Sequence, residues 1–115
     1  MIYSKTLEFA VRIVKFCKYL REEKKEFVIS NQILRSGTSI GANVRESKNA
    51  QSAPDYLTKM NIALKEADET QYWLELLFRS EYITDEEYQS LNSDIQELIA
   101  ILVSIVKKLK QKSNQ

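Results

Sequence analysis

The sequence predicts an all-α protein, a single-domain antiparallel four-helix bundle with up-down-up-down topology. The 115 residues include only two glycines and one proline, which indicates long helices joined by short connections. Apolar residues recur at spacings of three and four along four separate segments, which is typical of amphipathic helices. The chain is 43% hydrophobic, enough to bury one ordinary core. We expect helices at about residues 3–24, 30–49, 53–80 and 85–110.

The first predicted helix, residues 3–24, carries two neighbouring apolar stripes. One stripe is Phe9, Ile13, Phe16 and Leu20, and the other is Leu7, Ala10, Val14 and Cys17. Together they predict an unusually broad buried surface. The charged run at residues 21–26 then predicts a connection, after which Ser30 or Asn31 is expected to cap the second helix.

The second predicted helix, residues 30–49, has the most informative pattern in the chain. Its buried face is expected to contain Ile33, Gly37, Ile40 and Val44. Each helical glycine costs roughly 1 kcal/mol relative to alanine, so Gly37 and Gly41 indicate close approach of another segment. Polar residues at spacings of three and four form a stripe beside this face: Gln32, Arg35, Ser39, Asn43 and Glu46. We interpret the stripe as a buried or interfacial hydrogen-bond network, in which Arg35 pairs with Glu46 or Glu69.

The last two helices begin at clear capping signals. Ser52, Pro54 and Asp55 predict the start of the third helix, and the Thr84–Glu87 capping box opens the fourth. The inner stripe of the third helix is expected at Leu57, Met60, Leu64, Ala67, Gln71, Leu74 and Phe78. The fourth has an unbroken 3-4 repeat: Tyr88, Leu91, Ile95, Leu98, Leu102, Ile105 and Leu109. Because Ile99, Ile101, Val103 and Val106 lie outside this repeat, the helix is expected to be covered partly by other copies.

Charge is unevenly distributed along the chain, although the net charge is only +1. Residues 1–51 contain ten Lys/Arg and five Asp/Glu, residues 52–106 contain three and eleven, and residues 107–115 contain four lysines without an acid. The basic residues are candidates for contacts with a nucleic-acid phosphate backbone. The simpler interpretation is that lysines at a helix C-terminus complement its macrodipole and aid solubility. The candidates are Lys5, Arg12, Lys15, Lys107, Lys108, Lys110 and Lys112.

Several classes of protein are excluded by residues that the sequence lacks. The chain has no histidine, whereas a di-iron bundle enzyme requires Glu-x-x-His motifs. Cys17 lies on an apolar stripe without a histidine base, and no phosphate-binding glycine loop is present. We therefore expect no enzyme, cofactor, metal or small-molecule substrate.

The expected location is the cytoplasm, without a membrane partner. The apolar run at residues 98–106 is far shorter than the roughly 20 residues that span a membrane. Charges interrupt residues 1–16, so no signal peptide is expected. A single cysteine is compatible with a reducing compartment.

The chain resembles a known family over nearly its whole length, most specifically in two segments. QILRSGTSIGANVRES (residues 32–47) and SAPDYLTKMNIALKEADETQYWLELL (residues 52–77) are similar to the four-helix bundle protein family. That family includes proteins encoded by intervening sequences in bacterial large-subunit ribosomal RNA genes, sometimes labelled a ribosomal-protein family. It also includes the accessory variability determinants of diversity-generating retroelements.

The resemblance implies a bundle that assembles into a ring, typically a homopentamer. For the retroelement members it also implies nucleic-acid binding and a reverse-transcriptase partner, so the alternative function is a sequence-nonspecific RNA- or DNA-binding accessory factor. The family's recurring polar positions fall here on Gln32, Arg35, Ser39, Asn43, Glu46 and Glu69. Ser47 stands where the family often has glycine or alanine, and the net charge is lower than in the strongly basic retroelement members.

Overall fold

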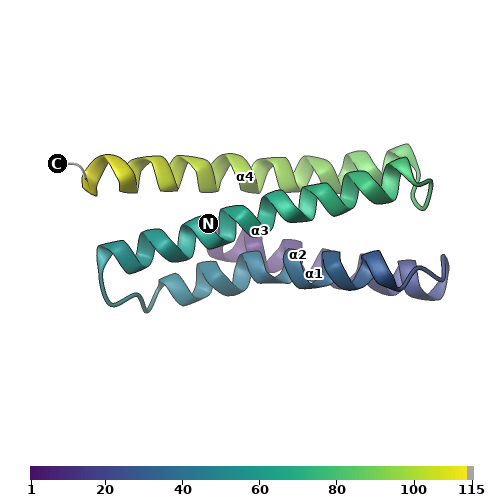
Figure 1. Cartoon of the computed structure of the whole chain (residues 1–115), viewed down its shortest axis with the longest axis horizontal. Coiled ribbons are helices and arrows are strands. Elements are labelled where there is room, and N and C mark those ends of the chain that lie inside the picture. Colours follow the sequence, from purple (N-terminus) through teal and green to yellow (C-terminus); the bar gives the residue numbers. More distant parts are fainter. Residues whose placement is uncertain (114–115) are drawn as a thin grey trace.

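Four long helices lie side by side along the 50 Å axis of a bundle that is 22 Å wide in both other directions (Figure 1). They are seen in a computed structural model that describes residues 1–113. The helices are α1 (Ile2–Glu22), α2 (Val28–Ser47), α3 (Ala53–Arg79) and α4 (Asp85–Ser113).

Contacts between the helices are compatible with the expected up-down-up-down topology. The Cys17 thiol donates to the Ser30 carbonyl across the α1–α2 connection, so these helices pair where one ends and the next begins. Ser36 on α2 contacts Thr70 on α3, and Gln71 on α3 contacts Asn92 on α4. Each helix packs on its neighbours in sequence, and α4 returns to α1 through a sparser contact. The predicted all-α four-helix bundle is confirmed.

The local capping signals predicted the starts of α3 and α4 correctly. The Ser52 hydroxyl accepts a hydrogen bond from the Asp55 amide at 3.2 Å. Thr84 and Glu87 form the expected reciprocal pair, with N···O distances of 3.1 and 2.8 Å. Such pairs satisfy backbone donors that have no partner inside the helix.

The predicted cap of α2 was wrong. The helix begins at Val28, ahead of both Ser30 and Asn31. The side chain of Glu26 replaces them, because its carboxylate accepts hydrogen bonds from the backbone amides of Val28, Ile29 and Ser30. Other boundaries also differ: α1 ends two residues earlier than predicted, and α4 continues three residues further, to Ser113.

Only one of the two apolar stripes predicted on α1 is buried in the chain. Phe9, Ile13, Phe16 and Leu20 enter the core, together with Cys17. In the second stripe Leu7 is 53% exposed and Val14 is 51% exposed. Among residues 1–113, α1 contacts α2 and α4, and one flank of the helix is left uncovered by this part of the chain.

Near the C-terminal end of α4, the buried side differs by one residue from the predicted repeat. Val106 is buried, whereas Ile105 and Leu109 are only partly buried. A straight α-helix drifts by about 20° per heptad from a 3.5-residue repeat, so the buried seam moves from position 105 to position 106. Val103 is 42% exposed, and Ile99 is half-buried.

Candidate interaction surfaces

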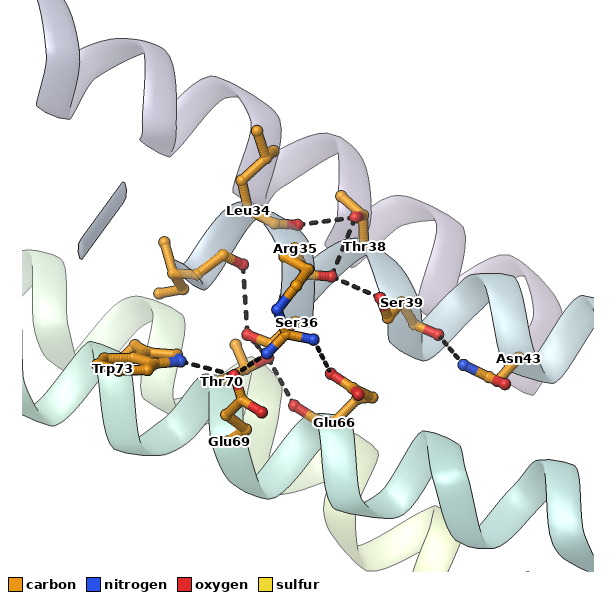
Figure 2. Close-up of polar contacts among 11 residues, drawn as sticks. Leu34, Arg35, Ser36, Thr38, Ser39, Asn43, Glu66, Glu69, Thr70 and Trp73 are labelled. Atoms are coloured by element: carbon orange, nitrogen blue, oxygen red, sulfur yellow. Dashed lines mark hydrogen bonds and ion pairs between the residues drawn. The ribbon is translucent and has the colours of Figure 1, made fainter. Parts of the chain in front are cut away.

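The polar stripe of α2 makes its strongest contacts with α3. The Arg35 guanidinium pairs with the carboxylates of Glu66, at 3.2 Å, and of Glu69 (Figure 2). The indole N–H of Trp73 donates to the same Glu69 oxygen at 2.9 Å. The hydrogen bond with Glu69 is the main reason why the pKa of Arg35 is raised. Arg35 and Glu69 thus join the two helices.

The remaining stripe residues do not extend this network. Ser39 donates to the Arg35 carbonyl at 2.6 Å, and Asn43 donates to the Ser39 carbonyl at 2.9 Å, both within α2 (Figure 2). Glu46 pairs with Lys59 at 3.1 Å and not with Arg35, and Gln32 is exposed. Of the two expected partners of Arg35, Glu69 is therefore the one that it contacts. Because Arg35 and Glu46 are exposed, the stripe is not buried within a single chain, and its role in an interface between chains stays a prediction.

A buried polar contact lies beside the stripe and was missed from the sequence. The Thr70 hydroxyl donates to the Ser36 hydroxyl at 2.9 Å, and both residues are fully buried. The Ser36 hydroxyl in turn bonds to the Ile33 carbonyl at 3.5 Å. The positions of the two residues could have indicated this contact, since Ser36 adjoins the apolar face of α2 and Thr70 lies between Ala67 and Leu74 on α3.

The Arg35–Glu69–Trp73 cluster predicts a specific dependence of stability on pH. The hydrogen bond from Trp73, followed by that from Arg35, lowers the pKa of Glu69 below its ordinary value of 4.5. A carboxylate with a lowered folded-state pKa stabilises the protein above its unfolded-state pKa, and this contribution is lost as pH falls through the folded-state value. We expect Glu69→Gln to be less stable than the wild type at pH 7, and the difference to shrink below about pH 4.5. Urea unfolding between pH 3 and pH 7 measures it.

Glu87 provides the matched comparison. Its pKa is also lowered, chiefly by the backbone amide of Thr84, but it lies at the start of α4. Glu87→Gln is expected to show the same pH trend. In double-mutant cycles with a substitution of Arg35, only Glu69→Gln should show a coupling energy, because Glu69 contacts Arg35 and Glu87 does not. Equal pH profiles for Glu69→Gln and the wild type would contradict the role assigned to Glu69.

Both glycines of α2 face α1 within the same chain. A Cβ atom at Gly37 would lie 2.9 Å from Cγ2 of Ile13, and one at Gly41 would lie 3.3 Å from the backbone carbonyl oxygen of Thr6. Carbon atoms in ordinary contact are about 3.5–4.0 Å apart. The close approach expected at these glycines is therefore the packing of α1 on α2.

The candidate basic residues do not form one site. Lys5 pairs with Glu97, and this hydrogen bond raises the pKa of Lys5. Arg12 pairs with Asp94 at 2.6 Å and also contacts Ser90, so both cations hold α1 to α4. Lys15 is exposed on α1, one turn from Arg12, and the two line the same hollow. The remaining four are exposed together near the end of α4: Lys107, Lys108, Lys110 and Lys112.

Two features of residues 1–113 bear on metal binding and on nucleophilic attack. No group of three or more His, Cys, Asp or Glu side chains in this part of the chain is placed to hold a metal ion. Cys17 is buried, and burial raises the pKa of its thiol to about 11, which makes it a poor nucleophile at neutral pH. None of the helices formed by these residues could span a membrane.

The helices form a small four-helix bundle protein with an exposed apolar flank on α1 and an exposed polar stripe on α2. The chain belongs to the family described as 23S rRNA-intervening sequence protein, whose sequence model matches residues 1–104. This confirms the family expected from the resemblance.

A solved structure agrees closely with this assignment. It is the crystal structure of a protein with unknown function from the S23 ribosomal protein family of Bacteroides thetaiotaomicron VPI-5482. The two chains are 62% identical and align with a TM-score of 0.92, covering 93% of this chain and 99% of the other. No curated protein is significantly similar to the chain.

Proposed function

We propose that this chain is a non-enzymatic, self-assembling protein of the cytoplasm that forms a ring-shaped homopentamer. The observation that carries the proposal is an exposed apolar stripe of α1, formed by Leu7 and Val14 of the second predicted stripe together with the adjoining Val11. Leu7, Val11 and Val14 lie along one flank of this helix and are each about half exposed. Scattered apolar side chains are normal on a protein surface, but a contiguous row of them indicates an interaction site.

The neighbouring surface of α2 is shaped for close contact. Thr38, Gly41 and Ala42 line a hollow together with Leu7 and Ala10, so small side chains adjoin the apolar stripe. Small residues let another helix approach closely, which increases the number of atom contacts. The polar stripe, with Arg35 and Glu46 exposed, borders this surface and supplies the polar rim that interfaces commonly have.

Charge introduced into the apolar stripe is expected to dissociate the assembly. In Val14→Glu a carboxylate would lose its water in an apolar contact between subunits, which is unfavourable even with Lys18 and Arg21 lining the same hollow. Light scattering after gel filtration should show five times the chain mass of 13.4 kDa for the wild type and a single chain for the variant. Circular dichroism checks that the variant remains helical.

Val28→Glu is the matched control, since Val28 is 74% exposed but lies at the start of α2, away from the stripe. It should assemble like the wild type. A wild-type protein that is monomeric at micromolar concentration rejects the proposal.

The second candidate function is sequence-nonspecific binding of RNA or DNA, as an accessory factor of a reverse transcriptase. The exposed cluster Lys107, Lys108, Lys110 and Lys112 supports it, because phosphate contacts need cations without partners of opposite charge. In a ring the cluster would be repeated on every subunit, and avidity would strengthen weak individual contacts.

Gel-shift titrations at several salt concentrations test this candidate. Binding should weaken steeply with salt and should fall when the four lysines are changed to glutamine. Lys24→Gln and Lys25→Gln, in the connection between α1 and α2, serve as controls for the loss of positive charge. Absence of binding at low salt rejects the candidate, and co-purification with a reverse transcriptase tests the partner.

A further inference from the structure

We infer that a single-stranded nucleic acid crosses the end of the bundle at which α1 and α3 begin, with its bases on Tyr3 and Tyr56 and its phosphates on Lys108 and Lys112. The inference rests on the proposed nucleic-acid binding and adds the site and the form of nucleic acid that fits it. Its physical basis is a row of cations and aromatic rings that extends over this end of the bundle, from Lys48 beside α2 to the last turns of α4.

A hollow beside α4 forms one end of the row, because α1 begins short of the end of α4. Lys5, one turn into α1, pairs with Glu97 on α4. From that level α4 continues for roughly 20 Å beyond the start of α1, and Figure 1 shows the N-terminus set back from this end of the bundle. Ile105, Lys108 and Lys112 continue the helical spacing of Glu97. Among residues 1–113, no part of α1 covers them.

The hollow combines an apolar wall with two available cations. Lys108 and Lys112 lie one turn apart on α4, and Tyr56 on α3 faces the same hollow. Within residues 1–113, neither lysine forms an ion pair with a carboxylate. Asp55, the acid beside Tyr56 in the sequence, instead accepts a hydrogen bond from the Gln51 amide at 3.1 Å, in the connection between α2 and α3. Both ammonium groups are therefore available to phosphates.

The row continues from Tyr56 across the end of the bundle. The Tyr56 hydroxyl interacts with Tyr3 on α1, and burial, followed by this contact, raises the pKa of Tyr56. The ammonium group of Lys48, just after the end of α2, lies 4.1 Å from the centre of the Tyr3 ring, where a cation is attracted to the ring face. Both rings are only partly buried. Two positioned aromatic rings are thus flanked by cations on either side.

This combination favours a single strand over a duplex. Bases of a single strand stack on aromatic side chains while its phosphates contact cations, and neither contact depends on the base sequence. In a duplex the bases are already stacked on one another, so only phosphate contacts would remain here. A membrane or an amphipathic protein helix would require a longer apolar surface than the wall of this hollow.

Fluorescence anisotropy with the full-length protein tests the inference, using a labelled oligothymidylate strand and a DNA duplex of the same length. The strand should bind about tenfold more tightly than the duplex. Changing Lys108 and Lys112 together to glutamine should weaken strand binding by about tenfold, and should lower the slope of log affinity against log salt by roughly 1.4, the value for two phosphates. Changing Lys107 and Lys110 is the matched control. It removes equal charge from the same turns of α4 but outside the hollow, and should cost about threefold at most.

Tyr56→Leu removes one ring and should weaken strand binding by about fivefold or more, whereas Tyr56→Phe keeps the ring and should bind like the wild type. Circular dichroism checks folding, and the lysine variants decide the question if Tyr56→Leu does not fold. Equal losses from the two lysine pairs, or a duplex bound as tightly as the strand, overturn the inference and leave nucleic-acid binding standing. Complete displacement of the strand by vesicles of phosphatidylserine and phosphatidylcholine overturns it in favour of a membrane surface. Absence of binding to both nucleic acids at low salt overturns the inference and the nucleic-acid candidate together.

Discussion

Gly37→Leu is expected to prevent stable folding of the bundle. Even the Cβ atom of the new side chain would lie 2.9 Å from Cγ2 and 3.0 Å from Cγ1 of Ile13. Both atoms are attached directly to the branched Cβ of Ile13, which is 1% exposed and has no space to move into. Overpacking by single methylene groups costs about 1–3 kcal/mol, so the larger leucine should lower the free energy of unfolding by more than about 3 kcal/mol. Urea unfolding followed by circular dichroism measures this loss.

Smaller substitutions isolate the cause. Alanine in place of glycine at an unhindered helical position stabilises a protein by about 1 kcal/mol, but Gly37→Ala should destabilise this one. Ile13→Ala removes the two obstructing atoms, so Gly37→Ala should be far less harmful in that background than in the wild type. A Gly37→Ala protein as stable as the wild type would contradict the close-packing argument.

The features that the sequence predicted best depend on local interactions. The starts of α3 and α4 are determined by residues three positions apart, such as Thr84 and Glu87, and these contacts do not require the rest of the fold. The start of α2 depends on tertiary packing as well as on the local sequence. Residues 21–26 contain three glutamates, and only the packing of α2 against α1 makes Glu26 the one that is buried.

The inner face of α3 shows why hydropathy alone misplaces a helix in a bundle. Leu64, Gln71 and Phe78 were expected to face the core, but Ala63, Thr70 and Leu77 are buried in their place. Helices approach most closely where side chains are small, so Ala63 and Thr70 occupy the centre of the contact. The larger Leu64 and Phe78 cover its edges, where they are partly buried.

The polar stripe was predicted only in part, for a geometric reason. Arg35 and Glu46 are eleven residues apart on one helix, which separates them by about 16 Å along its axis. They cannot pair within one chain, and each instead contacts the helix that lies beside it, at Glu69 and Lys59. Which side of α2 would face α3 depends on the rotation of both helices, and the stripe alone does not specify that rotation.

Glu26→Ala is expected to lower the free energy of unfolding by about 2–4 kcal/mol, a large effect for one side chain. The carboxylate of Glu26 accepts hydrogen bonds from the amides of Ser30 at 2.7 Å, Ile29 at 3.0 Å and Val28 at 3.2 Å. Because Glu26 is only 6% exposed, water cannot replace the carboxylate without opening the packing between α1 and α2. Its negative charge also interacts favourably with the positive N-terminal end of the α2 macrodipole.

Two further variants separate the contributions of charge and hydrogen bonding. Glu26→Gln keeps one acceptor oxygen but loses the charge, so its stability should fall between those of Glu26→Ala and the wild type. Glu46→Ala is the matched control, because Glu46 is exposed and pairs with Lys59 at the surface. Exposed pairs of this kind contribute about 0–1 kcal/mol. If Glu26→Ala and Glu46→Ala changed the urea midpoint equally, Glu26 would contribute no more to stability than an exposed residue does. A larger loss at Glu26, with amide exchange accelerated first at residues 28–30, would show that a carboxylate outside the helix determines where α2 begins.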